Sequence, residues 1–240
     1  MAKTLEEWIN TDVQEVRDKP IVWLSQYHFF RDPSRLTYLD SQYFFSPADG
    51  IILYQQVVEP DECLLDIKGK SYSLRDAIRD ESYSQKSLVI GVFMTFFDVH
   101  VNRIPYSGRL SYRELDPIDT LNHPMLDVER ALLDELRIPL ESAGYLHHNQ
   151  RMVNTIIYAS QLSQSYHVLQ IADYDVSCIT PFILKQNHQR AQGERFSQIR
   201  YGSQVDLIIP LSERYEFNPI QQPGYHIEAG LDPLVRIGEK

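Results

Sequence analysis

The feature that most constrains the fold is an apolar run at residues 88–97, LVIGVFMTFF, the most apolar stretch of the chain. The run lacks the alternation of a strand with one face in water, and it is rich in β-branched and aromatic residues. A membrane-spanning helix needs about 20 apolar residues, so the run is too short to cross a bilayer. We therefore predict a central β-strand that is buried on both faces.

Shorter apolar runs bounded by turn residues predict further strands at residues 43–45, 51–54, 152–158, 166–171 and 178–183, the last three at hairpin-like spacing. Helical spacing predicts a helix with Trp8 on its apolar face, opened by a capping box of Thr4 and Glu7 and ended by Pro20. We expect that face to pack onto the domain rather than onto a bilayer. Residues 29–35 have the pattern of a strand end and a charged turn. Two more helices are predicted at residues 73–78 and 125–136.

Charge and cysteine content narrow the classes of function and the compartment. A formal net charge of -10 argues against broad binding to nucleic acid, because an acidic surface repels phosphate. The basic segment 185–200 fits either a solvated loop or an anion or headgroup site. Cys63 and Cys178 have no redox or metal spacing, so we expect two free, buried thiols in the reducing cytoplasm. No signal peptide is recognisable, so any membrane contact would be peripheral.

Polar side chains follow the predicted central strand. Asp98, His100, Asn102 and Arg103 come directly after it, where a rigid strand holds them while a loop leaves them accessible. Asp49 lies in a Ser-Pro-Ala-Asp-Gly turn between two other strands, from which its carboxylate could bond local amides or reach a histidine. These residues are candidates for acid–base chemistry.

The step Gly202-Ser203 stands at the start of another predicted buried strand. Glycine lets a group approach its carbonyl closely, and a nearby base can turn the serine hydroxyl into a nucleophile. A lone Gly-Ser pair is more often a turn or a bulge. The Gly202-Ser203 step becomes informative only together with the turn that contains Asp49 and the polar residues after the central strand.

Taken in order, the three stretches resemble the phosphatidylserine decarboxylase family of self-processing pyruvoyl enzymes. The motifs are SPADG at residues 46–50, DVHVNRxPxxG at 98–108 and YGSxVD at 201–206, and the last two look most like the short bacterial and archaeal forms. Supporting matches at residues 30–33, 68–74, 149–151 and 193–196 extend the similarity over about residues 29–210. With the strand pattern, the resemblance implies an α+β fold of mainly antiparallel, sandwich- or barrel-like β-sheets with a few peripheral helices, in a single domain of residues 1–240.

The resemblance implies that the chain cleaves itself between Gly202 and Ser203 into a β chain of residues 1–202 and an α chain of residues 203–240. Ser203 would attack the carbonyl of Gly202 and end as a covalent pyruvoyl group, with His100 and Asp49 as base and orienting group. The pyruvoyl group would serve as electron sink in converting phosphatidylserine to phosphatidylethanolamine and CO2. His100 is the first candidate for the acid that protonates the product.

One position departs from the family pattern, because Arg103 stands where many bacterial members carry a second histidine. Either His100 serves both steps, or Asn102, Arg103 or a residue elsewhere takes one of them. Arginine stays charged and is a poor base, so Arg103 better suits holding a carboxylate or phosphate of the substrate. We expect no metal site, because ligand spacing is absent among the remaining histidines, His28, His123, His147, His148, His167, His188 and His226.

Two other functions remain open at this level. The chain could be a pyruvoyl decarboxylase of a soluble amino acid or related amine, or an uncleaved homologue that binds a lipid or another ligand. The expected partners are a phospholipid substrate and the two chains of one precursor, without nucleic acid. Peripheral contact with the cytoplasmic membrane and homo-oligomerisation are left open.

Overall fold

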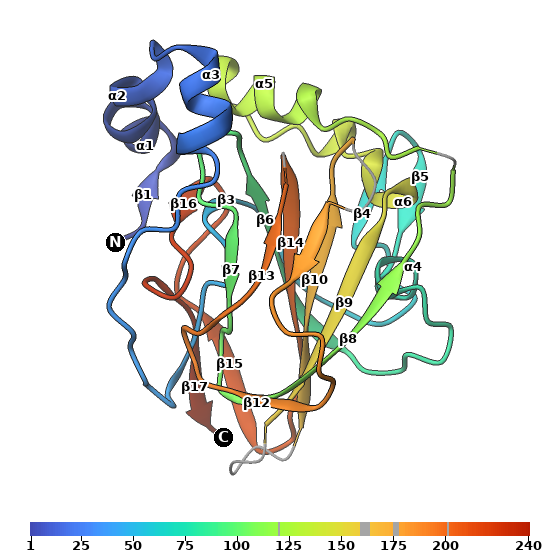
Figure 1. Cartoon of the computed structure of the whole chain (residues 1–240). Helices are drawn as coiled ribbons and strands as arrows, with labels where there is room; N and C mark the ends of the chain where they lie inside the picture. The colour runs from blue at the N-terminus through green and yellow to red at the C-terminus, as the bar shows by residue number, and fades with distance from the viewer. Residues whose placement is uncertain (120, 159–163, 175–177, 201) are drawn as a thin grey trace.

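The computed structural model describes residues 1–119, 121–158, 164–174, 178–200 and 202–240. A nine-stranded antiparallel sheet runs through the molecule in the order β1-β16-β3-β6-β14-β10-β9-β8-β12 (Figure 1). Its strands are β1 (Lys3–Thr4), β3 (Gly50–Val58), β6 (Ser87–Met94), β8 (Gly108–Leu115), β9 (Arg151–Ile157), β10 (Ser165–Ala172), β12 (His188–Arg190), β14 (Ser203–Pro210) and β16 (Tyr225–Ile227).

Smaller sheets accompany the central sheet. One contains β11 (Ile179–Pro181), β13 (Arg195–Ile199) and β7 (Val101–Arg103), and another contains β15 (Tyr215–Pro219), β17 (Pro233–Glu239) and β2 (Tyr43–Phe45). A two-stranded hairpin joins β4 (Leu65–Ile67) to β5 (Lys70–Tyr72). The expected α+β fold of mainly antiparallel sheets is confirmed.

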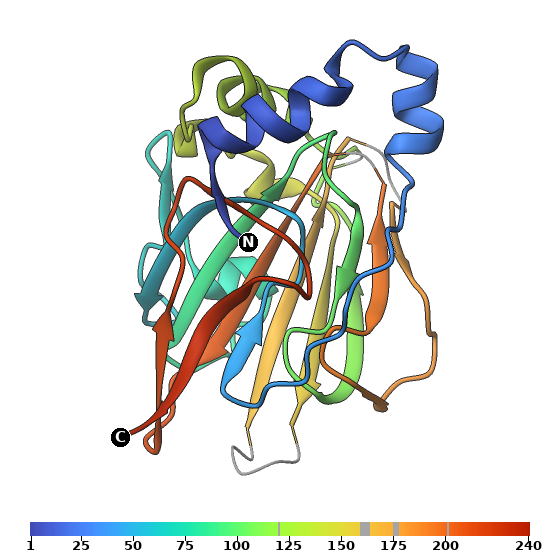
Figure 2. The ribbon, with the colours of Figure 1, turned by 90° about the vertical axis from the view of Figure 1, so that its left-hand side faces the viewer.

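The helices α1 to α3 and α5 gather over the end of the central sheet where β6 ends and β14 begins (Figure 1), and the view from the side agrees (Figure 2). The N-terminal helix consists of α1 (Leu5–Trp8), a π-helical stretch (Ile9–Val13) and α2 (Gln14–Arg17). A second helix consists of α3 (Ile21–Trp23) and a π-helical stretch (Leu24–His28), and the others are α4 (Leu74–Ile78), α5 (Leu126–Glu135), a 3-10 turn (Leu140–Ser142) and α6 (Tyr145–His148).

Strand β6 explains the apolar run, because its side chains enter two separate cores. Val89 and Phe93 face the core that the helices cover, whereas Val92 and Met94 face the core shared with the two three-stranded sheets. Every residue of β6 is buried. The prediction of a central strand buried on both faces is therefore confirmed.

Local signals at the helix starts are also confirmed. Thr4 and Glu7 form the capping box, and Ser73 caps α4. Trp8 is buried and its indole stacks on the ring of His226, with centroids 4.5 Å apart, so this face packs onto the domain as expected. Among the described residues, no helix is both long and apolar enough to span a membrane.

Four local predictions are wrong. Residues 21–28 are helical and do not lead into a strand end, because Pro20 opens a helix at a position where a missing N–H costs nothing. Strand β11 pairs with β13 rather than with β10. The segment 185–200 contains strands, not only a solvated loop, and Arg190 is buried beside Glu194. Both cysteines are free as expected, but Cys63 is exposed and only Cys178 is buried.

Candidate active site

Ser203 is the first residue of β14 and lies between two neighbouring strands. It pairs with Met94 of β6 on one side and with Ala172 of β10 on the other, and it is fully buried. Its hydroxyl donates to the sulfur of Met94, with Oγ and Sδ 3.3 Å apart. Thioether sulfur is a weak acceptor, so this contact leaves the hydroxyl available as a nucleophile.

Gly202, whose carbonyl precedes Ser203, lies beside two carboxyl groups. A Cβ added to Gly202 would stand 3.0 Å from Asp173 Oδ2 and 3.8 Å from Glu129 Oε2. Burial raises the pKa of Glu129 to about 7, and the charges of Asp173 and Asp98 add to this although the amide of Phe96 opposes it. A proton donor and acceptor poised near neutral pH therefore flanks the Gly202-Ser203 bond. Tyr201 of the sequence motif lies outside the described residues.

His100 is fully buried just before β7, and its ring stacks on Phe29 with centroids 4.0 Å apart. Its Nδ1 lies 3.0 Å from the carbonyl oxygen of Asp98, which can only accept, so Nδ1 carries the proton. Burial lowers the pKa of His100 to about 4 although the charge of Asp98 opposes this shift. The ring is therefore neutral at neutral pH, and its Nε2, which has no hydrogen-bond partner among the described residues, keeps a free lone pair.

Asp49 is buried, but its partners differ from those expected. Both carboxylate oxygens bind the guanidinium of Arg35 at 2.6 Å, and Oδ1 also accepts from the amide of Ala229 at 2.7 Å. The charge of Asp49 acts on the pKa of His100, but no hydrogen bond between described residues joins Asp49, His100 and Ser203 to one another. The roles expected for these three residues remain predictions.

Asn102 and Arg103 take different places on β7. Asn102 Nδ2 lies 3.6 Å from the same Met94 sulfur that Ser203 contacts, and its Oδ1 accepts from Gln170 at 2.7 Å. Arg103 donates to the carbonyl of Gly193 and lies 3.5 Å from the carboxylate of Asp32. Asn102 thus contacts the same sulfur as Ser203, whereas Arg103 bonds other protein groups.

A second buried histidine, His226, completes an ion pair that the sequence motifs do not reveal. His226 Nε2 lies 2.7 Å from Asp98 Oδ1, and the other oxygen of Asp98 accepts from the amide and hydroxyl of Thr95, each at 2.8 Å. Burial alone would raise the pKa of Asp98, but the charge and hydrogen bond of His226 and the bonds from Thr95 outweigh it and lower the pKa.

On the opposite face of β14 from Ser203, a buried polar network supports the strand. Gln204 Nε2 donates to Tyr54 and Asp206, each at 2.7 Å, while Tyr145 donates to Gln204 Oε1 at 2.6 Å. Tyr54 also donates to Asp206 at 2.8 Å. Burial raises the pKa of Asp206 to about 6, although the bonds from Gln204 and Tyr54 oppose it. Satisfied networks of this kind hold a strand in one position.

A cleft of about 250 Å³ opens beside these groups and gathers charges of both signs. Its lining includes Arg31, Arg35, Asp49, Asp98, His226 and Glu228. Ser203 and His100 are not among the described residues that line it, and both are fully buried. Ser203 is therefore not exposed to this cleft.

Sequence reasoning missed four groups at this site. Glu129, Asp173 and His226 belong to no motif, and Arg35 stands only in a charged turn. The apolar residues around position 129 indicate that α5 packs on the sheet. No local signal reveals that one carboxyl group of this helix faces Gly202. Such contacts depend on long-range packing.

Comparison with known proteins agrees with the resemblance. The model of the family described as phosphatidylserine decarboxylase matches residues 25–234. The phosphatidylserine decarboxylase proenzyme of Erythrobacter litoralis is 31% identical over 88% of this chain and 72% of its own length. A putative archaetidylserine decarboxylase proenzyme of Methanothermobacter thermautotrophicus is 30% identical over 76% of this chain and 69% of its own. The chain belongs to the phosphatidylserine decarboxylase family, a family of carboxy-lyases.

Proposed function

We propose that this chain is a proenzyme that cleaves itself between Gly202 and Ser203 and then removes the carboxyl group of a serine phospholipid, phosphatidylserine in the first place. The observation that carries the proposal is the position of Ser203. It is fully buried at the start of a central strand, and the preceding Gly202 lies beside two carboxyl groups. The matches to relatives named as proenzymes support the same reading.

Self-cleavage starts with the serine hydroxyl. Ser203 Oγ attacks the carbonyl carbon of Gly202, its proton passes to a base, and the peptide nitrogen is protonated as the C–N bond breaks, which leaves an ester. Loss of the Ser203 Cα proton then breaks the Cβ–O bond and releases Gly202 as a carboxylate. Water and loss of ammonia convert the remaining residue to the pyruvoyl group.

The residues fit a pyruvoyl group at position 203. The hydroxyl is bonded only to a weak acceptor, and a side chain at Gly202 would crowd the Asp173 carboxylate. The pyruvoyl group supplies the electron sink that no side chain offers. Asn102 and Met94 bound the space into which the reacting atoms would project.

Two groups here are suited to transfer protons. A second histidine at the position of Arg103 is therefore not needed. His100 presents a neutral Nε2 and is suited to accept the proton of Ser203. Glu129 has a pKa of about 7 and lies beside Gly202, so it can both take and return a proton at neutral pH. We assign removal of the Ser203 hydroxyl proton to His100. We assign the exchange of protons beside Gly202 to Glu129.

The charged cleft suits the headgroup of a serine phospholipid, which carries a phosphate, an ammonium and a carboxylate. Arg31, Arg35, Asp98 and Glu228 line the cleft, and a headgroup would have to compete with the bonds that Arg35 makes to Asp49 and that Asp98 makes to His226. Because Ser203 is buried and does not line this cleft, we expect cleavage after Gly202 to open a route from the cleft to position 203.

An exposed apolar segment at residues 21–30 supports contact with a membrane. Ile21, Val22 and Tyr27 of the second helix are 69%, 58% and 67% exposed, and Phe30 follows them at 43%. The helix α3 projects beyond the sheet (Figure 2). His28 of this segment also lines the charged cleft. The segment would therefore dip into the bilayer surface next to the headgroup site.

The test is release of CO2 from carboxyl-labelled substrates by purified protein. We expect turnover of phosphatidylserine in mixed vesicles and none of free serine or phosphoserine, with Ser203→Ala inactive on all of them. An Ile21→Ser/Val22→Ser variant should bind vesicles more weakly and lose turnover in vesicles more than in detergent micelles. Turnover of free serine alone would favour the soluble-amine alternative.

A further inference from the structure

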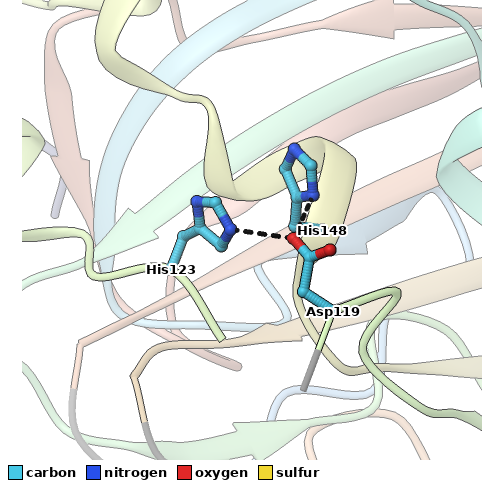
Figure 3. Close-up of side chains that lie close together, drawn as sticks. All are labelled: Asp119, His123 and His148. Carbon is cyan, nitrogen blue, oxygen red and sulfur yellow. Dashed lines mark hydrogen bonds and ion pairs between the residues drawn. The ribbon is translucent and has the colours of Figure 1, made fainter. Parts of the chain in front are cut away.

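Three side chains outside the candidate active site converge on one point at the surface. Asp119 and His123 lie on the loop before α5, and His148 ends α6 (Figure 3). Asp119 Oδ2 lies 3.1 Å from His123 Nε2 and 2.8 Å from His148 Nδ1, and one ligand atom from each residue lies within 4.8 Å of the others. We call these three residues the 119/123/148 cluster.

The backbone around the cluster is fixed from both sides. The amide of Ile118 donates to the carbonyl of His148 at 2.8 Å. Asn149 accepts from the amide of His123 at 2.6 Å and donates to its carbonyl at 2.8 Å, and the same side chain binds the carbonyl of Ala172 in β10. The histidines are therefore placed by the fold before any ligand arrives, which lowers the entropic cost of binding one.

The spacing of the three ligand atoms is compatible with a shared ion. A single oxygen of Asp119 faces a ring nitrogen of both His123 and His148. Zinc–ligand distances of about 2.0–2.1 Å in a tetrahedral site separate ligand atoms by about 3.3 Å. The distances of 3.1 and 2.8 Å lie close to that value.

Ring packing and charge point the same way. The imidazoles of His123 and His148 stack with centroids 4.3 Å apart and planes within 12°. One cation held by the carboxylate could bind a nitrogen of each stacked ring. The net charge of -10 also favours cation binding in general.

We propose that the 119/123/148 cluster binds a divalent transition-metal ion of the Zn²⁺ class, with two imidazole nitrogens, one carboxylate oxygen and water in the open position. Two histidines and one carboxylate are a ligand set that proteins use for such ions. Spacing along the sequence does not indicate the site, because His148 lies far along the chain from the other two ligands. The expectation of no metal site rested on that spacing alone.

Bound metal would clamp the loop before α5 onto α6. This loop leads to Met125, whose amide donates to Asp173 at 2.8 Å, and Asp173 is the group that lies against Gly202. The proposed metal site is thus structural and is linked to Gly202 through Met125 and Asp173. The metal proposal does not depend on the proposed reaction.

The experiment uses the full-length Ser203→Ala chain, purified without a histidine tag and stripped with a chelator. ZnCl₂ is titrated by calorimetry, and CoCl₂ is followed by its visible d–d absorption. We expect one saturable equivalent, a Co²⁺ spectrum of a four- or five-coordinate site, and a rise in melting temperature with Zn²⁺ because the ion binds only the folded state.

The variants His123→Ala, His148→Ala and Asp119→Asn should each weaken Zn²⁺ binding by at least about tenfold, as removal even of outer-shell partners does. His123→Ala/His148→Ala should abolish the Co²⁺ absorption. His188→Ala, a histidine of β12, is the matched control and should bind like the parent. The proposal is overturned if the parent shows no saturable binding, or if the double variant binds as tightly as the control.

Discussion

His100 and His226 are both buried close to Asp98, but their contacts suit them to different roles. His100 bonds only the backbone carbonyl of Asp98 among the described residues, is neutral, and leaves Nε2 without a hydrogen-bond partner among them. His226 binds the carboxylate of Asp98 directly and stacks on Trp8. The first histidine is suited to take a proton, and the second holds the structure around a buried charge.

The difference also concerns the two chains that self-cleavage would produce. Asp98 and His100 would belong to the β chain, whereas His226 would belong to the α chain. Strand β14 of the α chain would remain between β6 and β10 of the β chain. The ion pair and the central sheet would thus keep the two chains together after cleavage.

The largest effect is expected from His100→Gln. Removing the general base should slow self-cleavage by about 10²–10⁴-fold, the usual contribution of such a group. The measurement is the time course of chain splitting after cell-free synthesis, with His188→Gln as control. A rate unchanged from that of the control would remove His100 from the mechanism.

Stability should reverse the ranking of the two histidines. In the uncleaved Ser203→Ala background, His226→Leu should cost about 3 kcal/mol, because the buried Asp98 carboxylate loses its bond from Nε2 and keeps only those from Thr95. His100→Gln should cost only about 0.5–1.5 kcal/mol for one hydrogen bond. Denaturant unfolding measures both values.

A double variant tests whether the cost of His226→Leu comes from Asp98. Adding Asp98→Asn removes the buried charge that has lost its histidine partner, so the double variant should be more stable than the sum of the two single changes predicts. Strict additivity would mean that the pair does not act as a unit.

Glu129→Gln should change the stability at high pH. The folded-state pKa of Glu129 is about 7 against 4.5 for the exposed group, so the folded state holds an extra proton between these values and loses stability as pH rises through them. In the Ser203→Ala background, glutamine should therefore stabilise by up to about 3 kcal/mol at pH 8 and have little effect at pH 4. An equal effect at both pH values would contradict the buried carboxyl.

The smallest effect concerns acid sensitivity at His100. Its folded-state pKa of about 4 lies below the ordinary 6.5, so the unfolded state binds the proton first and stability falls as pH drops from 6.5 to 4. His100→Gln should remove up to about 1.4 kcal/mol per pH unit from that slope, or about 2 kcal/mol at pH 5. Parallel slopes for the two proteins would show that His100 is not buried in its neutral form.

Much of the fold could be predicted because its signals are local. The run at residues 88–97 has no polar face, so only a position between two cores suits it, and the capping boxes at Thr4 and Ser73 act within one turn. Residues 29–35 misled the prediction because the aromatic pair Phe29-Phe30 favours a strand, whereas these residues directly follow a helix that ends at His28.

The site was predictable only in part, for the same reason. Ser203, His100 and Asp49 stand in motifs and could be named, but the pairing of Asp49 with Arg35 and of Asp98 with His226 depends on packing between distant segments. Glu129 reaches Gly202 only because α5 covers the end of β14. No local pattern encodes these contacts.

The measurement that tests the central claim most directly is the intact mass of the purified wild-type protein beside Ser203→Ala. The account predicts two wild-type chains divided between Gly202 and Ser203, with the smaller lighter than its serine-terminated sequence by one ammonia, while Ser203→Ala stays whole. If both proteins remain whole at full mass after long incubation, the chain makes no pyruvoyl group, and the uncleaved binding homologue becomes the better description.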